Sequence, residues 1–162
     1  MTYSSFGPVN GCTPKEGYVK LNRVPVWQAS WCGSFPNERG INTFLVDPFS
    51  CSVQQLRRFD THASAAAAND LSNHLQLVNH GSIIVVVWAD EASGQMTGGA
   101  KSTMGLLGAD ISDVQYRGSY AFIAQKGYPA KTVLRKVLTA AETNIRPAQF
   151  NATVTGNTIR KG

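Results

Sequence analysis

Residues 83–88, Ile83-Ile84-Val85-Val86-Val87-Trp88, form an unbroken run of β-branched and aromatic side chains. The run lacks the alternation of polar and apolar residues that marks a strand with one wet face. We therefore expect a central strand that is covered on both faces. Gly81 precedes this strand and Asp90-Glu91 follows it, so both of its limits are marked by turn-forming or charged residues.

Two helices are expected around this strand. Between His62 and Asn79 the apolar residues recur every three or four positions, which is typical of an amphipathic helix, and Gly81 supplies its C-terminal stop. A shorter helix is expected to start after Thr97, whose hydroxyl can cap it, and to run through Leu107 until Gly108 ends it.

The remaining apolar segments predict the other strands of the fold. These are Tyr18–Leu21, Val24–Trp27, Ile41–Val46, Val53–Phe59, Tyr120–Ala124 and Phe150–Val154, the last of them as an edge strand. Val53–Phe59 alternates well enough to pair with Ile41–Val46, and Pro25 restricts its own strand to an edge or a bulge. Residues 133–141 fit a helix or a strand. The pattern as a whole predicts the α/β class, with a mixed sheet and helices packed against it.

The domain organisation follows from length and composition. The chain has 162 residues, which is room for one domain, and we expect an N-terminal loop or arm over 1–16 followed by a single domain over 17–162. A hydrophobic share of 43% argues against collagen-like, coiled-coil and disordered classes. The net charge of +5 permits binding of nucleic acid but does not require it, because the basic residues are scattered.

Membrane, secretion and metal signals are weak. The longest apolar run, Ile83–Ala89, is far shorter than the roughly 20 residues of a membrane span, and Met1–Ser4 lacks the features of a signal peptide. Cys12, Cys32 and Cys51 are an odd number without CxxC spacing, so one bridge with a spare thiol and three free thiols both remain open. No metal site and no cofactor is expected.

A small polar site is expected where strands end. Asp90 and Glu91 follow the central strand, Arg39 precedes the strand at 41–46, and Arg117 precedes the strand at 120–124. Guanidinium groups donate in a fixed fork and carboxylates accept, so their convergence would form a site of mixed sign. The alternatives are a solvated turn at Asp90-Glu91 and a structural ion pair between Asp90 and Arg117.

Aromatic residues supply a second component of this site. Tyr116 lies beside Arg117 in a polar loop and is expected to be exposed, as a platform for a sugar ring or a base. Trp88 lies on the central strand and is expected in the core. The rings of Trp27, Trp31 and Tyr120 fit either an exposed binding platform or the core.

Catalysis is the weaker functional class. Adjacent carboxylates on a strand point to opposite faces, which is poor geometry for a hydrolase built on Asp90 and Glu91. None of the motifs GxGxxG, HExxH and GxSxG, and no Walker loop, occurs in the sequence. His62, His74 and His80 are too far apart on the predicted helix to ligate a metal, and a solvated helix is expected instead.

An ordered series of short motifs resembles the interleukin-like EMT inducer (ILEI) family. The motifs are Arg39-Gly40-Ile41-Asn42, Arg58-Phe59-Asp60-Thr61, Gly81-Ser82-Ile83-Ile84-Val85, Asp90-Glu91-Ala92-Ser93, Ala100-Lys101, Leu106-Leu107-Gly108, Tyr116-Arg117-Gly118-Ser119-Tyr120-Ala121-Phe122-Ile123 and Lys126-Gly127. The match runs from Arg39 to Gly127. Each motif alone is weak, and their order and spacing carry the resemblance.

The resemblance implies a compact β-β-α domain of the α/β (α+β) class, with antiparallel or mixed sheets flanked by two or three helices and without catalytic activity of its own. The family includes the carbohydrate-binding stem domain of an O-mannose N-acetylglucosaminyltransferase, whose sugar-binding arginines and aspartate align with Arg39, Asp90 and Arg117. Similar domains occur in bacteriophage tail proteins, a setting that suits a chain with only 15% charged residues.

The functional hypothesis is therefore a lectin-like module that binds a glycan or cell-surface polysaccharide through Arg39, Asp90, Arg117, Glu91 and Tyr116. Its expected setting is a phage tail fibre, where it would form a homotrimer in the virion, or another extracellular recognition protein. The alternative is a secreted cytokine-like domain that binds a protein receptor. Nucleic-acid binding and membrane insertion are not expected.

Overall fold

The computed structural model describes residues 2–5, 15–31, 39–89, 91–128, 134–139, 148–155 and 158–161. Two helices lie within these ranges, α1 (Ala65–Leu77) and α2 (Gly98–Leu106). The strands within them are β1 (Thr2–Ser5), β2 (Lys15–Leu21), β3 (Val24–Trp31), β4 (Gly40–Val46), β5 (Val53–Phe59), β6 (Ile83–Ala89), β7 (Ser119–Gln125), β8 (Leu134–Leu138), β9 (Ala148–Thr155) and β10 (Thr158–Lys161).

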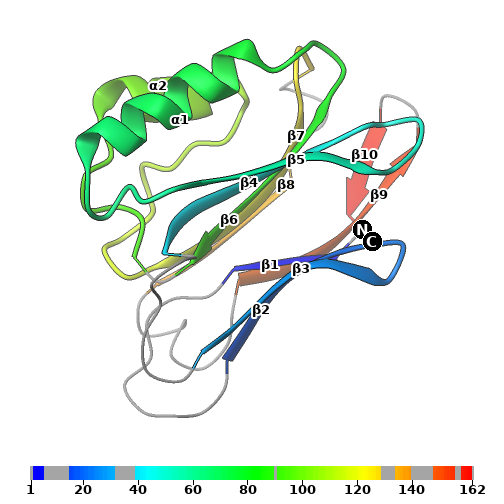
Figure 1. The fold of residues 1–162 in the computed structure, drawn as a ribbon, viewed down its shortest axis with the longest axis horizontal. Coiled ribbons are helices and arrows are strands. Elements are labelled where there is room, and N and C mark those ends of the chain that lie inside the picture. The colour runs from blue at the N-terminus through cyan, green and yellow to red at the C-terminus, as the bar shows by residue number, and fades with distance from the viewer. Residues whose placement is uncertain are drawn as a thin grey trace.

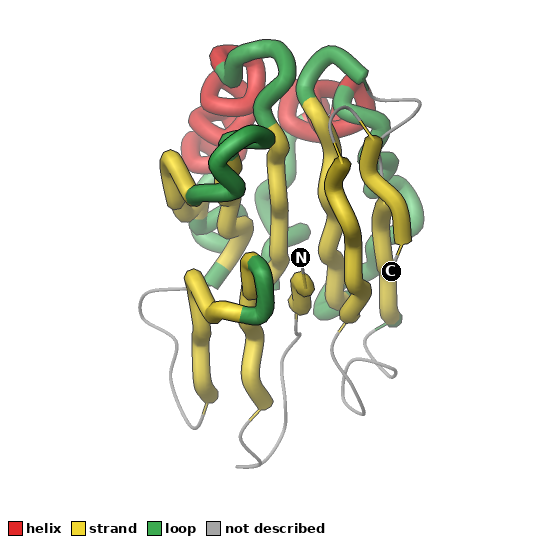
Figure 2. The backbone as a smooth tube through the Cα atoms, turned by 90° about the vertical axis from the view of Figure 1, so that its right-hand side faces the viewer, coloured by secondary structure: helices red, strands yellow, loops and turns green. Residues whose placement is uncertain are grey.

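The elements form three layers (Figure 1). The middle layer is a sheet with the order β5-β4-β6-β7-β8, and the second sheet has the order β10-β9-β1-β2-β3. Every described ladder is antiparallel. The two helices pack on the face of the middle sheet that points away from the second sheet, and they lie beside each other in Figure 2. The α+β expectation is confirmed, and the sheets are of the antiparallel kind.

Strand β6 is the centre of both cores. All seven of its residues are buried, and it pairs with β4 on one side and β7 on the other. Ile84, Val86 and Trp88 pack toward the helices, whereas the alternate side chains of β6 pack toward the second sheet. Burying each of these large apolar side chains contributes about 1.5–3 kcal/mol. The prediction of a strand covered on both faces is confirmed, and Trp88 lies in the core as expected.

Both predicted helices form. The Thr97 cap and the Gly108 end of α2 are as expected, whereas α1 is capped by Ser64, which was not predicted, and ends at Leu77 with Val78 as its C-cap, before the expected Gly81. The Ser64 hydroxyl accepts from the amides of Ala66 and Ala67 at the start of α1, and the Thr97 hydroxyl accepts from Ala100 N at the start of α2. Gly108 has a φ of +82°, so it ends α2 in the left-handed region that glycine enters without steric cost. Neither described helix is long and apolar enough to span a bilayer.

Strand β3 shows how Pro25 is accommodated. β3 is an edge strand, and its ladder with β2 shifts register between Val19 and Lys20, where Lys20 faces Pro25. A proline lacks an N–H group, so an edge position beside an irregularity avoids the loss of a ladder hydrogen bond. Both parts of the expectation for Pro25 are confirmed.

Two expectations about strands need correction. Residues 2–5 do not form a loop: Thr2–Ser5 is strand β1, which lies between β9 and β2. The strand predicted at 150–154 is not at the edge, because β10 pairs with the far side of β9. The segment that fitted a helix or a strand contains β8. The division into an N-terminal arm over 1–16 and a single domain over 17–162 stays a prediction.

The expectation of solvated histidines is wrong for His74. Its side chain is 7% exposed, its Nε2 lies 3.4 Å from the Thr43 hydroxyl, and its ring packs against Phe59. Burial, and secondly the positive charge of Arg57, lower the pKa of His74 from 6.5. The helical periodicity marked apolar residues as the buried face and gave no sign that an imidazole would share it.

Acidification is expected to destabilise the fold through His74. The pKa of His74 is lower in the folded state than in the unfolded state, so the unfolded state binds the proton more tightly. The contribution of neutral His74 to the free energy of unfolding is therefore complete above pH 6.5 and is lost as pH falls through the folded pKa. We expect His74→Gln to lose less unfolding free energy than the wild type between about pH 7.5 and about pH 5.5 in denaturant titrations. His80→Gln is the matched control, since His80 is exposed. An unchanged pH slope in His74→Gln would contradict the prediction.

Candidate functional site

Four strand ends meet at one end of the middle sheet. Gly40 at the start of β4 pairs with Ala89 at the end of β6, and Ile41 pairs with Phe59 at the end of β5. Strand β7 starts at the same end, because its Ala121 pairs with Val87. The residues that flank these ends are far apart in sequence and adjacent in the fold. Arg39, Glu91 and Arg117 all lie here, whereas Asp90 lies outside the described residues.

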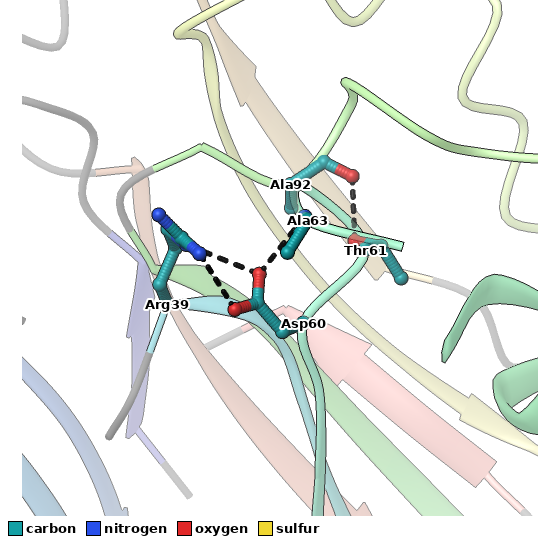
Figure 3. A network of polar contacts seen from close by, with 5 residues as sticks. All are labelled: Arg39, Asp60, Thr61, Ala63 and Ala92. Atoms are coloured by element: carbon teal, nitrogen blue, oxygen red, sulfur yellow. Dashed lines mark hydrogen bonds and ion pairs between the residues drawn. The ribbon is translucent and has the colours of Figure 1, made fainter. Parts of the chain in front are cut away.

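Arg39 forms a bidentate ion pair with Asp60 (Figure 3). Its Nε donates to Asp60 Oδ1 at 3.1 Å and its Nη2 donates to Oδ2 at 2.8 Å. The two side chains are 33% and 26% exposed, so the pair is accessible from solvent. Two parallel hydrogen bonds fix the plane of the guanidinium, and its remaining N–H groups keep a defined direction.

Asp60 was not among the predicted site residues. It directly follows a strand, as Asp90 does, so the same reasoning about strand ends would have found it. Burial alone would raise the pKa of Asp60, but hydrogen bonds from Arg39 and from the Ala63 amide, with the charges of Arg39 and Arg58, lower it below 3.8. Asp60 therefore stays ionised through the physiological range, and it orders the turn that leads to α1.

A buried hydrogen bond joins this turn to the loop after β6. The Thr61 hydroxyl donates to the Ala92 carbonyl at 2.6 Å (Figure 3). The backbone amide of Gln95 donates to the Thr61 carbonyl at 2.8 Å. These contacts hold the residues after β5 against the residues after β6. The Arg39–Asp60 pair and the Glu91 segment are therefore parts of one fixed structure.

Glu91 organises the loop before β7. Its side chain is 4% exposed, and its carboxylate accepts from the Ser93 amide, the Ser93 hydroxyl and the Arg117 amide. Arg117 has a φ of +59°, a left-handed conformation that is uncommon for a residue other than glycine. The hydrogen bond from its amide to a buried carboxylate holds the backbone in this conformation. Both Glu91 oxygens are thus engaged within the protein.

Arg117 and Tyr116 form the exposed part of the site. Tyr116 is 59% exposed, as predicted, and the Arg117 guanidinium carbon lies 5.7 Å from the centre of its ring. A guanidinium over an aromatic ring combines hydrogen-bond donors with an apolar face in one surface. Tyr120, by contrast, is fully buried, Trp27 is partly buried with its ring edge against Phe44, and the Trp31 side chain is outside what the structure describes.

The described residues offer no cluster of three or more His, Cys, Asp or Glu side chains that could hold a metal ion. Cys51 has a free thiol, and Cys12 and Cys32 lie outside the described residues. The exposed groups described at this end of the sheet are hydrogen-bond donors and the aromatic ring of Tyr116.

The sequence pattern of one family, interleukin-like EMT inducer, matches residues 39–128, more than half of the chain. The chain belongs to the ILEI family. The matched region spans the middle sheet from β4 to β7 with both helices, so it contains every element that positions Arg39, Glu91 and Arg117.

Curated relatives of this ILEI chain are larger proteins. The human cell migration-inducing and hyaluronan-binding protein is 30% identical over 108 residues, which is 66% of this chain and 8% of the relative. The zebrafish (Danio rerio) cell surface hyaluronidase is 34% identical over 91 residues, which is 55% of this chain and 7% of the relative. The chain thus spans less than a tenth of the length of these relatives.

Proposed function

We propose that this ILEI chain is a non-catalytic carbohydrate-binding domain whose site is the end of the middle sheet that carries Arg39, Asp90, Tyr116 and Arg117. The observation that carries the proposal is the exposed Arg117–Tyr116 pair, held in place by the buried Glu91 carboxylate. An exposed aromatic face takes the C–H face of a sugar ring, and a fixed guanidinium donates to the hydroxyl or carboxylate oxygens around it.

The roles of the predicted residues differ in this proposal. Arg117 and Tyr116 contact the sugar, and Arg39 contributes a guanidinium whose plane is fixed by Asp60. Asp90 accepts from sugar hydroxyls, which is the part of the proposal that rests on the sequence alone. Glu91 is a positioning residue, because its oxygens are engaged by Ser93 and by the Arg117 amide.

The names of the relatives supply the first ligand to test. One is a hyaluronan-binding protein and another is a cell surface hyaluronidase, so we infer an extracellular glycan as the ligand class and hyaluronan oligosaccharides as the first probe. The narrower setting, which the resemblance to domains of bacteriophage tail proteins suggests and the charge-poor composition suits, is attachment to a host by a trimeric tail fibre in the virion. Analytical ultracentrifugation of the protein would detect such a trimer.

Arg117→Ala is expected to weaken binding of glycan about tenfold or more in isothermal titration calorimetry. Loss of a charge-assisted hydrogen bond costs about 1.5–3 kcal/mol, and the aromatic contact of Tyr116 loses its support as well. Asp90→Ala is expected to have a similar effect.

Arg160→Ala is the matched control for this experiment, because Arg160 is exposed on β10 in the other sheet. The probes are hyaluronan oligosaccharides and N-acetylglucosamine oligomers. Wild-type affinity in both Arg117→Ala and Asp90→Ala would refute the proposed site. Saturable binding of a protein receptor without any glycan binding would favour the cytokine-like alternative.

A further inference from the structure

A pocket of about 430 Å³ opens at the opposite end of the middle sheet. Its walls come from the end of β4, the start of β5, the C-terminal end of α1 and the residue before β6. The lining residues are Leu45, Val46, Asp47, Gln54, Gln55, Leu77, Val78, Asn79 and Ser82. Its volume lies in the range of about 300–1,000 Å³ that is typical of small-molecule sites.

The lining combines apolar and hydrogen-bonding side chains. Leu77 projects into solvent at 83% exposure, whereas Val78 is buried in the core beneath the helices and Val46 in the core between the two sheets. Amide and hydroxyl side chains form most of the remaining lining. A sugar ring has the same two properties, an apolar C–H face and a rim of hydroxyl groups, whereas a purely apolar ligand would leave the amides of this pocket without partners.

The polar groups of the pocket are available to a ligand. Among the described residues, the side chains of Gln55, Asn79 and Ser82 have no hydrogen-bond partner in the protein. Gln54 donates its amide N–H to the Ser52 hydroxyl at 2.8 Å, and its side-chain carbonyl is left to accept. Together these side chains offer both donors and acceptors, which hydroxyl groups can satisfy at once.

The charge of the pocket selects against anions. Asp47 is the one charged side chain among the described lining residues, and the backbone N–H of Ser50 lowers its pKa, so it is ionised at neutral pH. The C-terminal end of α1, which carries the negative end of the helix dipole, forms the adjacent wall. The Lys126 ammonium is directed to the carbonyls of Leu75 and Gln76. A carboxylate in the pocket would face Asp47 without a cationic lining partner.

We propose that this pocket is a second binding site, specific for a neutral saccharide ring. It lies about 20 Å from the Arg39 end, as the seven residues of β4 rise about 3.3 Å each. Its residues are separate from those of the other site, and the two ends differ in charge. Binding here does not depend on whether the Arg117 end binds a glycan.

Two-dimensional ¹H–¹⁵N NMR titration of the full chain tests this proposal. The probes are the uncharged methyl glycosides of glucose, galactose, mannose and N-acetylglucosamine. We expect at least one of them to give saturable shifts at the backbone amides of Asp47, Gln55, Asn79 and Ser82. The double variant Gln55→Ala/Asn79→Ala should bind that glycoside about tenfold more weakly, since each side-chain hydrogen bond contributes roughly 0.5–1.5 kcal/mol.

Matched controls separate this site from the other one. Gln115→Ala and Asn73→Ala remove the same side-chain types at exposed positions outside the pocket, and they should leave the shifts unchanged. Arg117→Ala should also leave them unchanged. The proposal is overturned if no neutral glycoside gives saturable shifts at the pocket, if shifts appear only around Tyr116 and Arg117, or if the double variant binds as the wild type does.

Discussion

Gly40→Ala is expected to destabilise the protein by about 3 kcal/mol or more, a large fraction of the roughly 5–15 kcal/mol by which a typical domain is stable. Gly40 has a φ of +101°, which side chains other than hydrogen rarely allow, and a Cβ atom there would lie 2.2 Å from the Phe59 carbonyl oxygen. The obstacle is backbone of the paired strand β5, so it cannot rotate away. Chemical denaturation followed by circular dichroism measures the loss.

The matched substitution for Gly40→Ala is Gly105→Ala. Gly105 lies inside α2 and no atom lies within 4 Å of an added Cβ, so alanine there should stabilise the protein by about 0.5–1 kcal/mol. If Gly40→Ala lowers the free energy of unfolding and Gly105→Ala raises it, the loss at Gly40 is caused by the close approach of the Phe59 carbonyl and not by the substitution of glycine as such. A Gly40→Ala protein as stable as the wild type would show that β4 and β5 separate more easily than the register indicates.

Glu91→Ala is expected to have the second largest effect, about 3 kcal/mol on unfolding. The substitution leaves the amides of Ser93 and Arg117 without their acceptor, and hydrogen bonds to a charged group are worth about 1.5–3 kcal/mol each before partial compensation by water. The Arg117 backbone also loses the contact that holds its left-handed conformation. Thermal unfolding and glycan titration of the same variant measure both consequences.

Asp70→Ala is the control for the loss of a carboxylate, because Asp70 is exposed on α1. It should change stability by less than about 0.5 kcal/mol. If Glu91→Ala keeps wild-type stability, the carboxylate does not order the loop. If it is destabilised but binds glycan normally, Glu91 has no positioning role in the site.

Periodicity predicted the parts of the fold that bury apolar side chains. The β-branched run at β6 and the spacing of apolar residues in α1 are local signals, and both elements formed as expected. Strand β1 has no such signal: Thr2–Ser5 is polar apart from one tyrosine, and its strand conformation depends on pairing with β2 and β9. Pairing between distant segments is not encoded in local composition.

The candidate site was predictable in position but not in its contacts. Charged residues beside strand ends indicated Arg39, Glu91 and Arg117 correctly as neighbours of one sheet end. Their partners were not evident, because the Arg39–Asp60 pair depends on the β4–β5 register and the Glu91–Arg117 bond depends on a positive φ. Register and backbone conformation are properties of the folded chain and not of residue type.

The position of β1 has a consequence for the order of folding. Its four residues precede the other described strands along the chain, but one of their two neighbours, β9, begins at Ala148. β1 lies between the β2–β3 pair and the β9–β10 pair in the order of the second sheet, so this layer cannot close until β9 has been synthesised. Until then the edges of β1 and β2 are open to intermolecular pairing, and a chaperone that shields them would raise the yield of folded protein.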